Sequence, residues 1–281
     1  MRQAEIALQA LARAYPEESF RLRRVTSAGD RLRDVSLEEV DGQGFFTAAL
    51  ERVLLQGEAD LAVHSLKDLP IELDDRFMIA AVLPRGDARD ALVSRHGPLN
   101  ALPPRARVGT DSSRRRSQLL LLRPDLVIAP VRGNIPTRLA KLDRGDYDAV
   151  VLAIAGLERL DLGGRATQLL PLDVCLPAPG QGAIALEAMA GSEWAQRAHA
   201  VNDPASAAAV AAERAFLAAL GGGCRTPVGV HATVSGDRLR LDGVAIELGV
   251  AQRVSVEGSA DRPATIGREA GLQVLSRGVA V

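Results

Sequence analysis

Short apolar runs alternate with amphipathic helical runs across residues 105–160. The apolar segments are 107–108, 126–131 and 149–153, and a stretch with helical periodicity follows each of them. Strands joined through helices lie parallel in one sheet, because a helix must carry the chain back across the sheet face. This part of the chain therefore predicts an α/β fold with a mostly parallel sheet and helices on its faces.

The regions on either side predict further elements. Before residue 105 we expect helices at 4–15 and 45–56 and strands at 20–26, 60–64, 77–83 and 91–94. After it we expect a strand at 183–188, a long helix at 204–220, strands at 228–235, 238–246 and 250–258, and a helix at 263–277. The last three strands are separated only by turn residues, which predicts a small antiparallel α+β domain.

The composition is that of an ordinary globular protein. Of 281 residues, 47% are hydrophobic and 25% are charged, and the formal net charge is −1. A nearly neutral chain has no overall positive field for nucleic acid or anionic lipid, so we expect neither as a partner. No apolar run approaches the length needed to span a bilayer, and the first residues are not followed by a long apolar segment, so we expect no secretory signal. We therefore expect a cytoplasmic protein.

A single thiol stands in an unusual setting at Cys224. The predicted helix ends in Gly221-Gly222-Gly223, Cys224 follows at once, and Pro227 prevents a return to helix. The sulfur is thus expected on a tight loop, where a group can be attached. The other cysteine, Cys175, lies in an apolar run and is expected to be a small buried hydrophobe.

Polar clusters follow several predicted strands. They are His64–Asp68, Thr110–Arg116, Arg132–Asn134 and Glu158–Arg159. Ligands of open α/β sheets bind at the carboxyl ends of strands, where helix N-termini and arginines favour anions. These clusters predict a cleft for a ligand with several negative charges.

Each cluster also has a structural interpretation. Ser112 or Asp111 can be a helix cap, and His64 can be a packed histidine. Arg114, Arg115 and Arg116 occupy consecutive helical positions and cannot all face one way, so a solvated surface role is open for this run. No His, Cys, Asp and Glu cluster has the spacing of a metal site, and we expect no metal.

The motifs, taken together, resemble the porphobilinogen deaminase (hydroxymethylbilane synthase) family. The carrying segments are Asp60–Pro70 with Lys67-Asp68, Val108–Arg115, Arg132–Leu139, Tyr147–Leu157, Pro179-Gly180-Gln181-Gly182, Ala212-Glu213-Arg214 and Gly222-Gly223-Cys224. They keep the family's order and approximate spacing over most of the chain.

The resemblance implies a three-domain enzyme. Two α/β domains similar to periplasmic binding proteins would flank a cleft, and a small C-terminal α+β domain with a three-stranded antiparallel sheet would carry the cysteine. The expected domains are 1–84 with 183–200, then 88–177, then 203–281. The Gln181 segment would be one of two crossings between the first two domains.

The resemblance also implies the chemistry. Such a transferase joins four porphobilinogen molecules, with loss of ammonia, onto a dipyrromethane held on Cys224 by a thioether, and releases hydroxymethylbilane for porphyrin and haem biosynthesis. Asp68 would be the catalytic residue. The cofactor would be held by Cys224, Lys67, Asp68, Ser112, Arg114 and Arg115. Substrate would be bound by Arg2, Thr110, Arg132, Arg138, Arg159 and Gln181. We expect a monomer.

The chain departs from the family pattern at several positions. Ala4, Gln43, Thr47 and Asp111 replace residues usual in the family, and the strand usual before Arg2-Gln3 does not precede it in this sequence. Two alternatives therefore stay open: a degenerate or shortened member that holds anionic pyrroles without full turnover, and a non-catalytic binding protein for an anionic solute. An unmodified Cys224 would favour the second.

Overall fold

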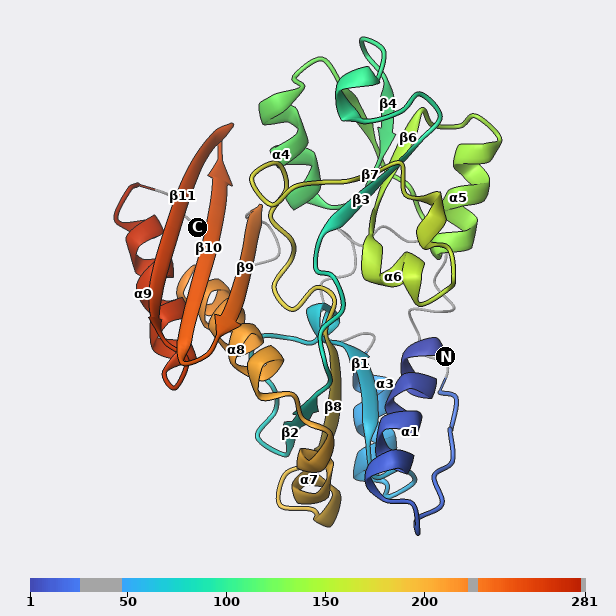
Figure 1. Ribbon diagram of the computed structural model, residues 1–281, viewed down its shortest axis with the longest axis vertical. Coiled ribbons are helices and arrows are strands. Elements are labelled where there is room, and N and C mark those ends of the chain that lie inside the picture. Colours follow the sequence, from blue (N-terminus) through green and yellow to red (C-terminus); the bar gives the residue numbers. More distant parts are fainter. Residues whose placement is uncertain (26–46, 222–226, 279–281) are drawn as a thin grey trace. The chain divides into compact units, whose positions relative to one another are not determined.

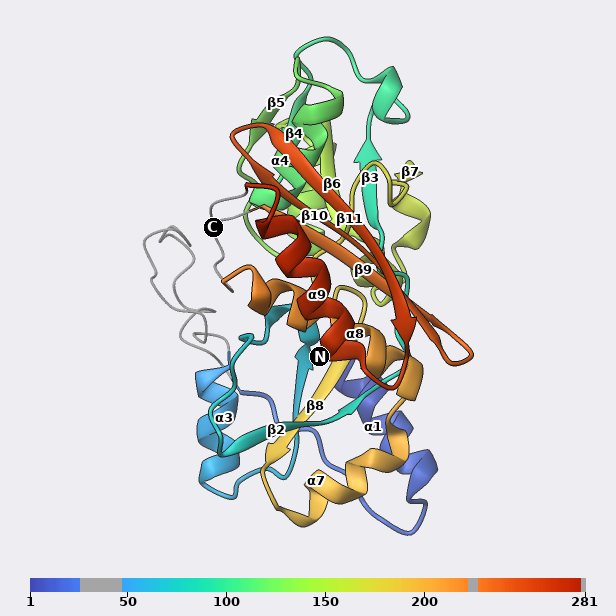
Figure 2. The same ribbon diagram turned by 90° about the vertical axis from the view of Figure 1, so that its left-hand side faces the viewer.

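The computed structural model describes residues 1–25, 47–221 and 227–278, and divides into two compact units. Unit 1 comprises 1–85 and 183–207, and unit 2 comprises 86–182 and 208–281. Figures 1 and 2 label the elements. The three-domain division expected from the sequence stays a prediction.

Unit 1 is built on an antiparallel sheet. In the described residues the sheet has the order β1-β8-β2, formed by β1 (Ala62–Ser65), β8 (Ile184–Met189) and β2 (Phe77–Val82). Ala62 pairs with Glu187 and Phe77 with Met189. The helical elements of the unit are α1 (Arg2–Ala14), α3 (Ala48–Leu55), the 3-10 turn η1 (Leu66–Asp68), α7 (Glu193–Arg197) and η4 (Ala198–Val201).

The two faces of this sheet bury different helices. Alternate residues of β8, such as Leu186, pack with Leu11 of α1 and Ala195 of α7. The other face packs Ala62 and Phe77 against Leu54 of α3. Because side chains alternate along a strand, Glu187 points to the α3 face.

Unit 2 contains a mixed sheet in the order β5-β4-β6-β3-β7. Its strands are β3 (Asp90–Ser94), β4 (Arg107–Gly109), β5 (Val127–Ala129), β6 (Ala149–Ala153) and β7 (Gln168–Leu169), with helices α4 (Ser113–Leu122), α5 (Ile135–Asp143) and α6 (Ile154–Glu158) and the 3-10 turns η2 (Leu99–Ala101) and η3 (Gly163–Arg165). One sheet face packs Val150 and Leu152 with Leu139 of α5 and Leu157 of α6. The other packs Val108, Ala149 and Val151 with Leu119 of α4.

The C-terminal part of unit 2 is an antiparallel sheet in the order β11-β10-β9, covered by helices. The strands are β9 (Val228–Ser235), β10 (Arg238–Glu247) and β11 (Val250–Ser259), and the helices are α8 (Pro204–Ala219), which begins in unit 1, and α9 (Pro263–Leu275). Phe216 of α8 and Val274 of α9 are buried against Leu239 and Leu241 of β10. Figure 2 shows α9 lying along this sheet.

The predicted α/β class and the C-terminal antiparallel sheet are confirmed. The prediction of parallel strands is confirmed for the three strands of residues 105–160, and β3, which precedes that region, is the antiparallel member of the sheet. Strands β4, β5 and β6 are parallel, whereas β3 runs antiparallel to both β6 and β7. Strand β3 enters directly from the crossing at residue 86, without a helix on the sheet face, so the crossover rule does not fix its direction.

The prediction of a strand at 20–26 was wrong for the residues described. Residues 20–25 form no strand. Phe20 instead packs edge-on against Trp194, with ring centroids 5.4 Å apart. Leu22, the next apolar residue of the alternating pattern, is exposed, so the pattern does not mark a buried strand face here.

Candidate functional site

The Lys67-Asp68 pair lies on a short turn at the end of β1. Leu66 is buried, and the backbone nitrogen of Leu69 donates to the carbonyl oxygen of Leu66, which closes the 3-10 turn η1. Leu66 thus anchors the turn, while Lys67 and Asp68 stay exposed. The strand end presents both charged groups to solvent.

Asp68 has an electrostatically mixed environment. Burial by the surrounding protein raises the pKa of its carboxyl group, and the charges of Lys67 and His64 and a hydrogen bond from Ser65 oppose that shift. Because the side chain remains accessible to solvent, water still stabilises the anion and limits the rise. The side-chain amide of Gln3 donates to Ser65 Oγ over 2.6 Å, which orients the serine that bonds Asp68.

His64 of β1 forms a buried contact with Glu187 of the neighbouring strand β8. His64 Nε2 lies 2.9 Å from Glu187 Oε2, and both side chains are almost fully buried. The other carboxylate oxygen of Glu187, Oε1, is buried with no hydrogen-bond partner among the described residues. The expectation that His64 is a packed, hydrogen-bonded residue is therefore confirmed by its geometry.

Arg2 is held on the surface of α1. Its Nη1 atom lies 3.3 Å from Glu5 Oε2, and both side chains are exposed. Among its described neighbours this glutamate is its ion-pair partner, so its predicted role in binding substrate stays a prediction.

Thr110 and Ser112 form the N-terminus of α4 in unit 2. Ser112 Oγ accepts from the backbone nitrogen of Arg115, and Thr110 Oγ1 accepts from the backbone nitrogen of Ser112 over 3.2 Å. Thr110 is buried. Ser112, rather than Asp111, is thus the helix cap.

Arg114 and Arg115 are buried, whereas Arg116 is exposed. Arg114 Nη1 donates to Asp90 Oδ2 over 2.8 Å, and Arg115 Nη2 donates to Asp90 Oδ1 over 2.7 Å. Burial by itself would raise the pKa of the Asp90 carboxyl, but the two guanidinium groups hold it well below its usual range. The structure thus places both predicted cofactor arginines on one buried aspartate.

Arg132 and Arg138 lie at the N-terminal end of α5. Arg138 Nε donates to the Gly133 carbonyl oxygen over 2.8 Å, and Arg138 Nη2 lies 3.8 Å from Asp111 Oδ2. Lys141 Nζ donates to the Arg132 carbonyl oxygen. Burial lowers the pKa of Arg138, which Asp111 partly offsets. Asp111 is therefore a competitor for the guanidinium of a predicted substrate-binding residue.

Arg159 and Gln181 lie where the chain leaves unit 2. Arg159 Nη2 donates to the Gly182 carbonyl oxygen over 2.6 Å. Gln181 is buried, and its Nε2 donates to the Ala88 carbonyl oxygen and to Asp90 Oδ1, both over 2.8 Å. These two predicted substrate residues thus hold the crossing segments of the backbone.

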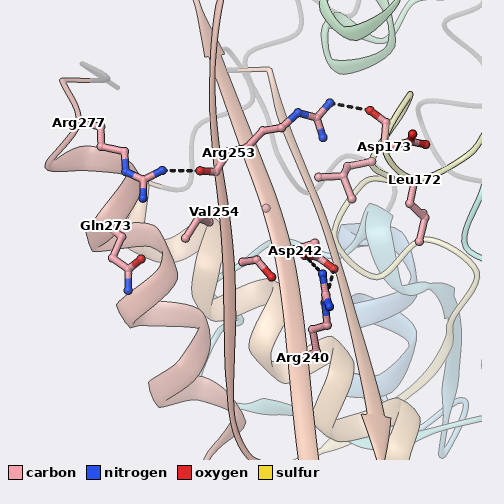
Figure 3. A pocket seen from close by; sticks show the side chains of 11 residues that line it. Leu172, Asp173, Arg240, Asp242, Arg253, Val254, Gln273 and Arg277 are labelled. Atoms are coloured by element: carbon pink, nitrogen blue, oxygen red, sulfur yellow. Dashed lines mark hydrogen bonds and ion pairs between the residues drawn. The ribbon is translucent and has the colours of Figure 1, made fainter.

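A separate hollow of about 550 Å³ lies on the C-terminal sheet (Figure 3). Its three arginines are already engaged: Arg240 with Asp242, Arg253 with the Asp173 carbonyl, and Arg277 with the Arg253 carbonyl. None of the predicted site residues that the structure describes lines this hollow.

The structure brings the predicted residues together in three groups within the described residues. Lys67 and Asp68 share one turn; Arg114, Arg115 and Gln181 converge on Asp90; and Thr110, Ser112 and Arg138 surround Asp111 along the ends of β4 and α5. Cys224 lies outside the described residues. The sequence did not predict a role for Asp90, because the segment Gly86-Asp87-Ala88-Arg89-Asp90 has the composition of a surface turn.

Comparisons with known proteins decide the family. Residues 1–197 match the family model "Porphobilinogen deaminase, dipyromethane cofactor binding domain", and residues 207–276 match "Porphobilinogen deaminase, C-terminal domain". The chain belongs to the porphobilinogen deaminase family. It is a transferase of tetrapyrrole biosynthesis that acts on porphobilinogen and uses dipyrromethane as its cofactor.

Curated members of this family align over nearly the whole chain. The porphobilinogen deaminase of Moorella thermoacetica is 46% identical over 280 residues, covering 98% of this chain and 90% of the relative. That of Roseiflexus castenholzii is 46% identical over 279 residues, covering 98% and 92%. Among solved structures, the second substrate binding domain of a putative amino acid ABC transporter from Streptococcus pneumoniae gives a TM-score of 0.41 at 16% identity, covering 78% of this chain and 84% of that one.

The residues of unit 2 fit a cofactor rich in carboxylates. Two buried guanidinium groups share one carboxylate, and Arg115 Nε is buried with no hydrogen-bond partner among the described residues. A buried donor without a partner is costly unless a ligand satisfies it. The described residues contain no group of three His, Cys, Asp or Glu side chains placed to hold a metal ion. No helix within the described ranges is long and apolar enough to cross a membrane.

Proposed function

We propose that Asp68 is the catalytic residue of this deaminase and that Cys224 anchors its dipyrromethane through a thioether. The observation that carries the first assignment is the position of Asp68: an exposed carboxylate on a turn whose backbone is fixed by buried Leu66. A carboxylate held on a rigid turn stabilises positive charge that develops on a ring beside it and can assist proton transfer. Lys67 and the Ser65 hydroxyl favour the ionised form that this role requires.

The arginines bind the acetate and propionate groups. Arg114 and Arg115 hold the cofactor together with Lys67, Asp68 and Ser112, and Arg132, Arg138 and Arg159 bind substrate together with Arg2 and Thr110. Planar guanidinium groups suit carboxylates because two N–H groups can bond two oxygens at once. The bound dipyrromethane supplies the free pyrrole carbon to which each new ring is joined.

The remaining assignments concern partners, oligomeric state and localisation. With a net charge of −1 and no basic excess, we expect no binding to nucleic acid. We also propose that the enzyme is monomeric and cytoplasmic. Sedimentation of the purified protein as a single species with the mass of one chain supports the monomer, and a concentration-dependent larger species contradicts it.

The test of the catalytic assignment is Asp68→Asn, which keeps the size of the side chain and removes its charge. We expect this variant to be folded and to carry cofactor, but to release ammonia from porphobilinogen at least about 100-fold more slowly. Asp74→Asn is the control, since Asp74 is an exposed aspartate of the same unit that pairs with Arg76. Turnover of Asp68→Asn within a few-fold of the parent would remove Asp68 from the mechanism.

A further inference from the structure

Asp90 is a buried carboxylate of unit 2 that is bonded by side chains from three different residues. It begins β3 and is 0% exposed. Its Oδ2 accepts from Arg114 Nη1 over 2.8 Å and lies 3.5 Å from Cys175 Sγ. Its Oδ1 accepts from Arg115 Nη2 over 2.7 Å and from Gln181 Nε2 over 2.8 Å. Both oxygens are therefore shared between the arginines of α4 and groups of the segment 175–181.

The charges in this cluster do not cancel. Two guanidinium groups meet one carboxylate, which leaves one positive charge. Burial raises the pKa of Cys175 to about 12, so its thiol stays neutral and contributes no charge. Nearby in unit 2, Arg138 and Asp111 lie 3.8 Å apart and offset each other. The excess positive charge resides on the Asp90 cluster itself.

The two guanidinium groups are also fixed in direction. Arg114 Nη1 donates to the Leu176 carbonyl oxygen over 2.6 Å, and Arg115 Nη1 donates to the Val151 carbonyl oxygen over 2.9 Å. Rotation of either side chain would break a bond to Asp90 and a bond to the backbone together. Groups held in this way bind a ligand without first losing conformational entropy.

The Asp90 carboxylate is also linked, through Gln181, to the segments in which the chain crosses between the units. Gln181 bonds Asp90 and the Ala88 carbonyl oxygen at once, and the backbone nitrogen of Gly86 donates to the Gly182 carbonyl oxygen over 3.2 Å. Residues 85–86 and 182–183 are two of the three points at which the chain passes between the units, the third being 207–208 within α8. Asp90 thus connects the arginine pair to the crossing segments at 85–86 and 182–183.

We propose that Asp90 is a positioning residue, which holds Arg114 and Arg115 as a pair with one unneutralised positive charge for a pyrrole carboxylate and which, through Gln181, ties that pair to the two crossing segments. This inference rests on the proposed function, in which Arg114 and Arg115 hold the cofactor. It adds a residue that touches neither cofactor nor substrate, and it assigns Gln181 a role in support rather than in direct contact.

Gln118 provides a matched control for a purely structural role. It is a buried glutamine of α4 that bonds the same segment, with Oε1 accepting from the Leu176 backbone nitrogen and Nε2 donating to the Leu176 carbonyl oxygen. Within the described part of the chain, its other hydrogen bonds go to the Arg114 carbonyl oxygen and to Cys175 Sγ rather than to Asp90. Loss of Gln118 therefore loosens the segment without releasing the arginine pair.

The experiment compares Asp90→Asn, Gln181→Met and Gln118→Met with the parent chain. For each we would measure the intact denatured mass, the melting temperature, and kcat and KM for porphobilinogen. We expect Asp90→Asn to be recovered mainly with the bare chain mass, and Gln181→Met to be loaded with KM raised about tenfold and kcat changed less than twofold. Gln118→Met should melt lower than the parent yet show normal cofactor mass and KM.

Gln181→Met keeps the inference testable if Asp90→Asn does not fold. The inference is overturned if folded Asp90→Asn carries the cofactor with unchanged KM, or if Gln118→Met raises KM as much as Gln181→Met does. A parent chain without the added dipyrromethane mass would overturn the proposed function, and this inference with it. A loaded parent beside a normally loaded Asp90→Asn with unchanged KM would overturn the inference alone.

Discussion

The backbone nitrogen of Gly86 donates a hydrogen bond to the carbonyl oxygen of Gly182 over 3.2 Å, where the two crossing segments run side by side. Gly182 has φ +87°, and a Cβ atom there would lie 2.6 Å from the Gly86 carbonyl oxygen. Neither the backbone conformation nor the contact distance admits a side chain. The glycine of the Gly180-Gln181-Gly182 motif is therefore required for the crossing itself.

Gly182→Ala is expected to lower the free energy of unfolding by more than the roughly 1–2 kcal/mol that a left-handed backbone conformation alone costs an alanine. Gly191→Ala is the matched control, because Gly191 has φ +77° and a Cβ atom added there would meet nothing within 4 Å. Chemical denaturation of both variants gives the comparison. Equal losses of stability in Gly182→Ala and Gly191→Ala would mean that the backbone moves away from Gly86 without a cost in free energy.

A second prediction concerns pH. The raised pKa of Asp68 means that the folded protein binds this proton more tightly than the unfolded chain. As the pH rises from the ordinary pKa of an aspartate to the raised pKa of Asp68, the contribution of this carboxyl group to folding stability falls. Over the same pH range the ionised carboxylate forms, and catalysis by it rises. We expect kcat/KM to fall on the acid side with an apparent pKa above about 4, the ordinary value for aspartate.

The control for the pH profile is Asp74→Asn. Hydrogen bonds from Arg76 lower the pKa of Asp74 to about 2, so this group does not titrate in the working range. The variant should reproduce the parent profile. An acid limb at or below about pH 4 in the parent would contradict the assigned environment of Asp68.

A third prediction concerns the buried pair of unit 1. Removing one partner of a buried hydrogen-bonded pair leaves the other polar group without its partner, so Glu187→Ala should lower stability by about 1–3 kcal/mol. A double-mutant cycle with His64→Ala should give a coupling free energy above about 1 kcal/mol. The exposed pair of His96 and Asp148, also 2.9 Å apart, is the control and should couple more weakly. Equal coupling in the two cycles would mean that burial adds nothing to the His64–Glu187 interaction.

A fourth prediction concerns Asp111. Because Asp111 lies 3.8 Å from the Arg138 guanidinium, Asp111→Ser should free that group for a substrate carboxylate. The side chains of this pair are half-buried and the contact is long, so we take its worth as up to about 1 kcal/mol and expect KM for porphobilinogen to fall by up to about fivefold. Asp146→Ser makes the same change in charge at the exposed pair with Arg144 and should leave KM unchanged. A KM that rises in Asp111→Ser would show that Asp111 supports the site.

Local patterns in the sequence predicted much of this fold. The helix cap at Ser112 or Asp111 and the burial of Cys175 each depend on neighbours within one or two turns; both predictions are confirmed, and the cap is Ser112. The sequence also indicated that the three consecutive arginines cannot all face one way, and Arg116 is the exposed one. The direction of β3 was not predictable in the same way, because it depends on which strand lies beside it rather than on its own residues.

Asp90 was missed for a related reason. Its partners Arg114, Arg115 and Gln181 lie 24, 25 and 91 residues further along the chain. Nothing in the segment around Asp90 distinguishes an aspartate at the start of a strand from one in a surface turn. Only tertiary structure reveals that it is buried and that it gathers residues from two predicted motifs.

The central claim is that this chain carries dipyrromethane on Cys224, and the intact mass of the purified, denatured protein tests it most directly. The account predicts a mass above that of the sequence by two deaminated porphobilinogen units, and the bare chain mass in Cys224→Ser. The parent protein at the bare chain mass, or Cys224→Ser with the same added mass, would contradict the claim.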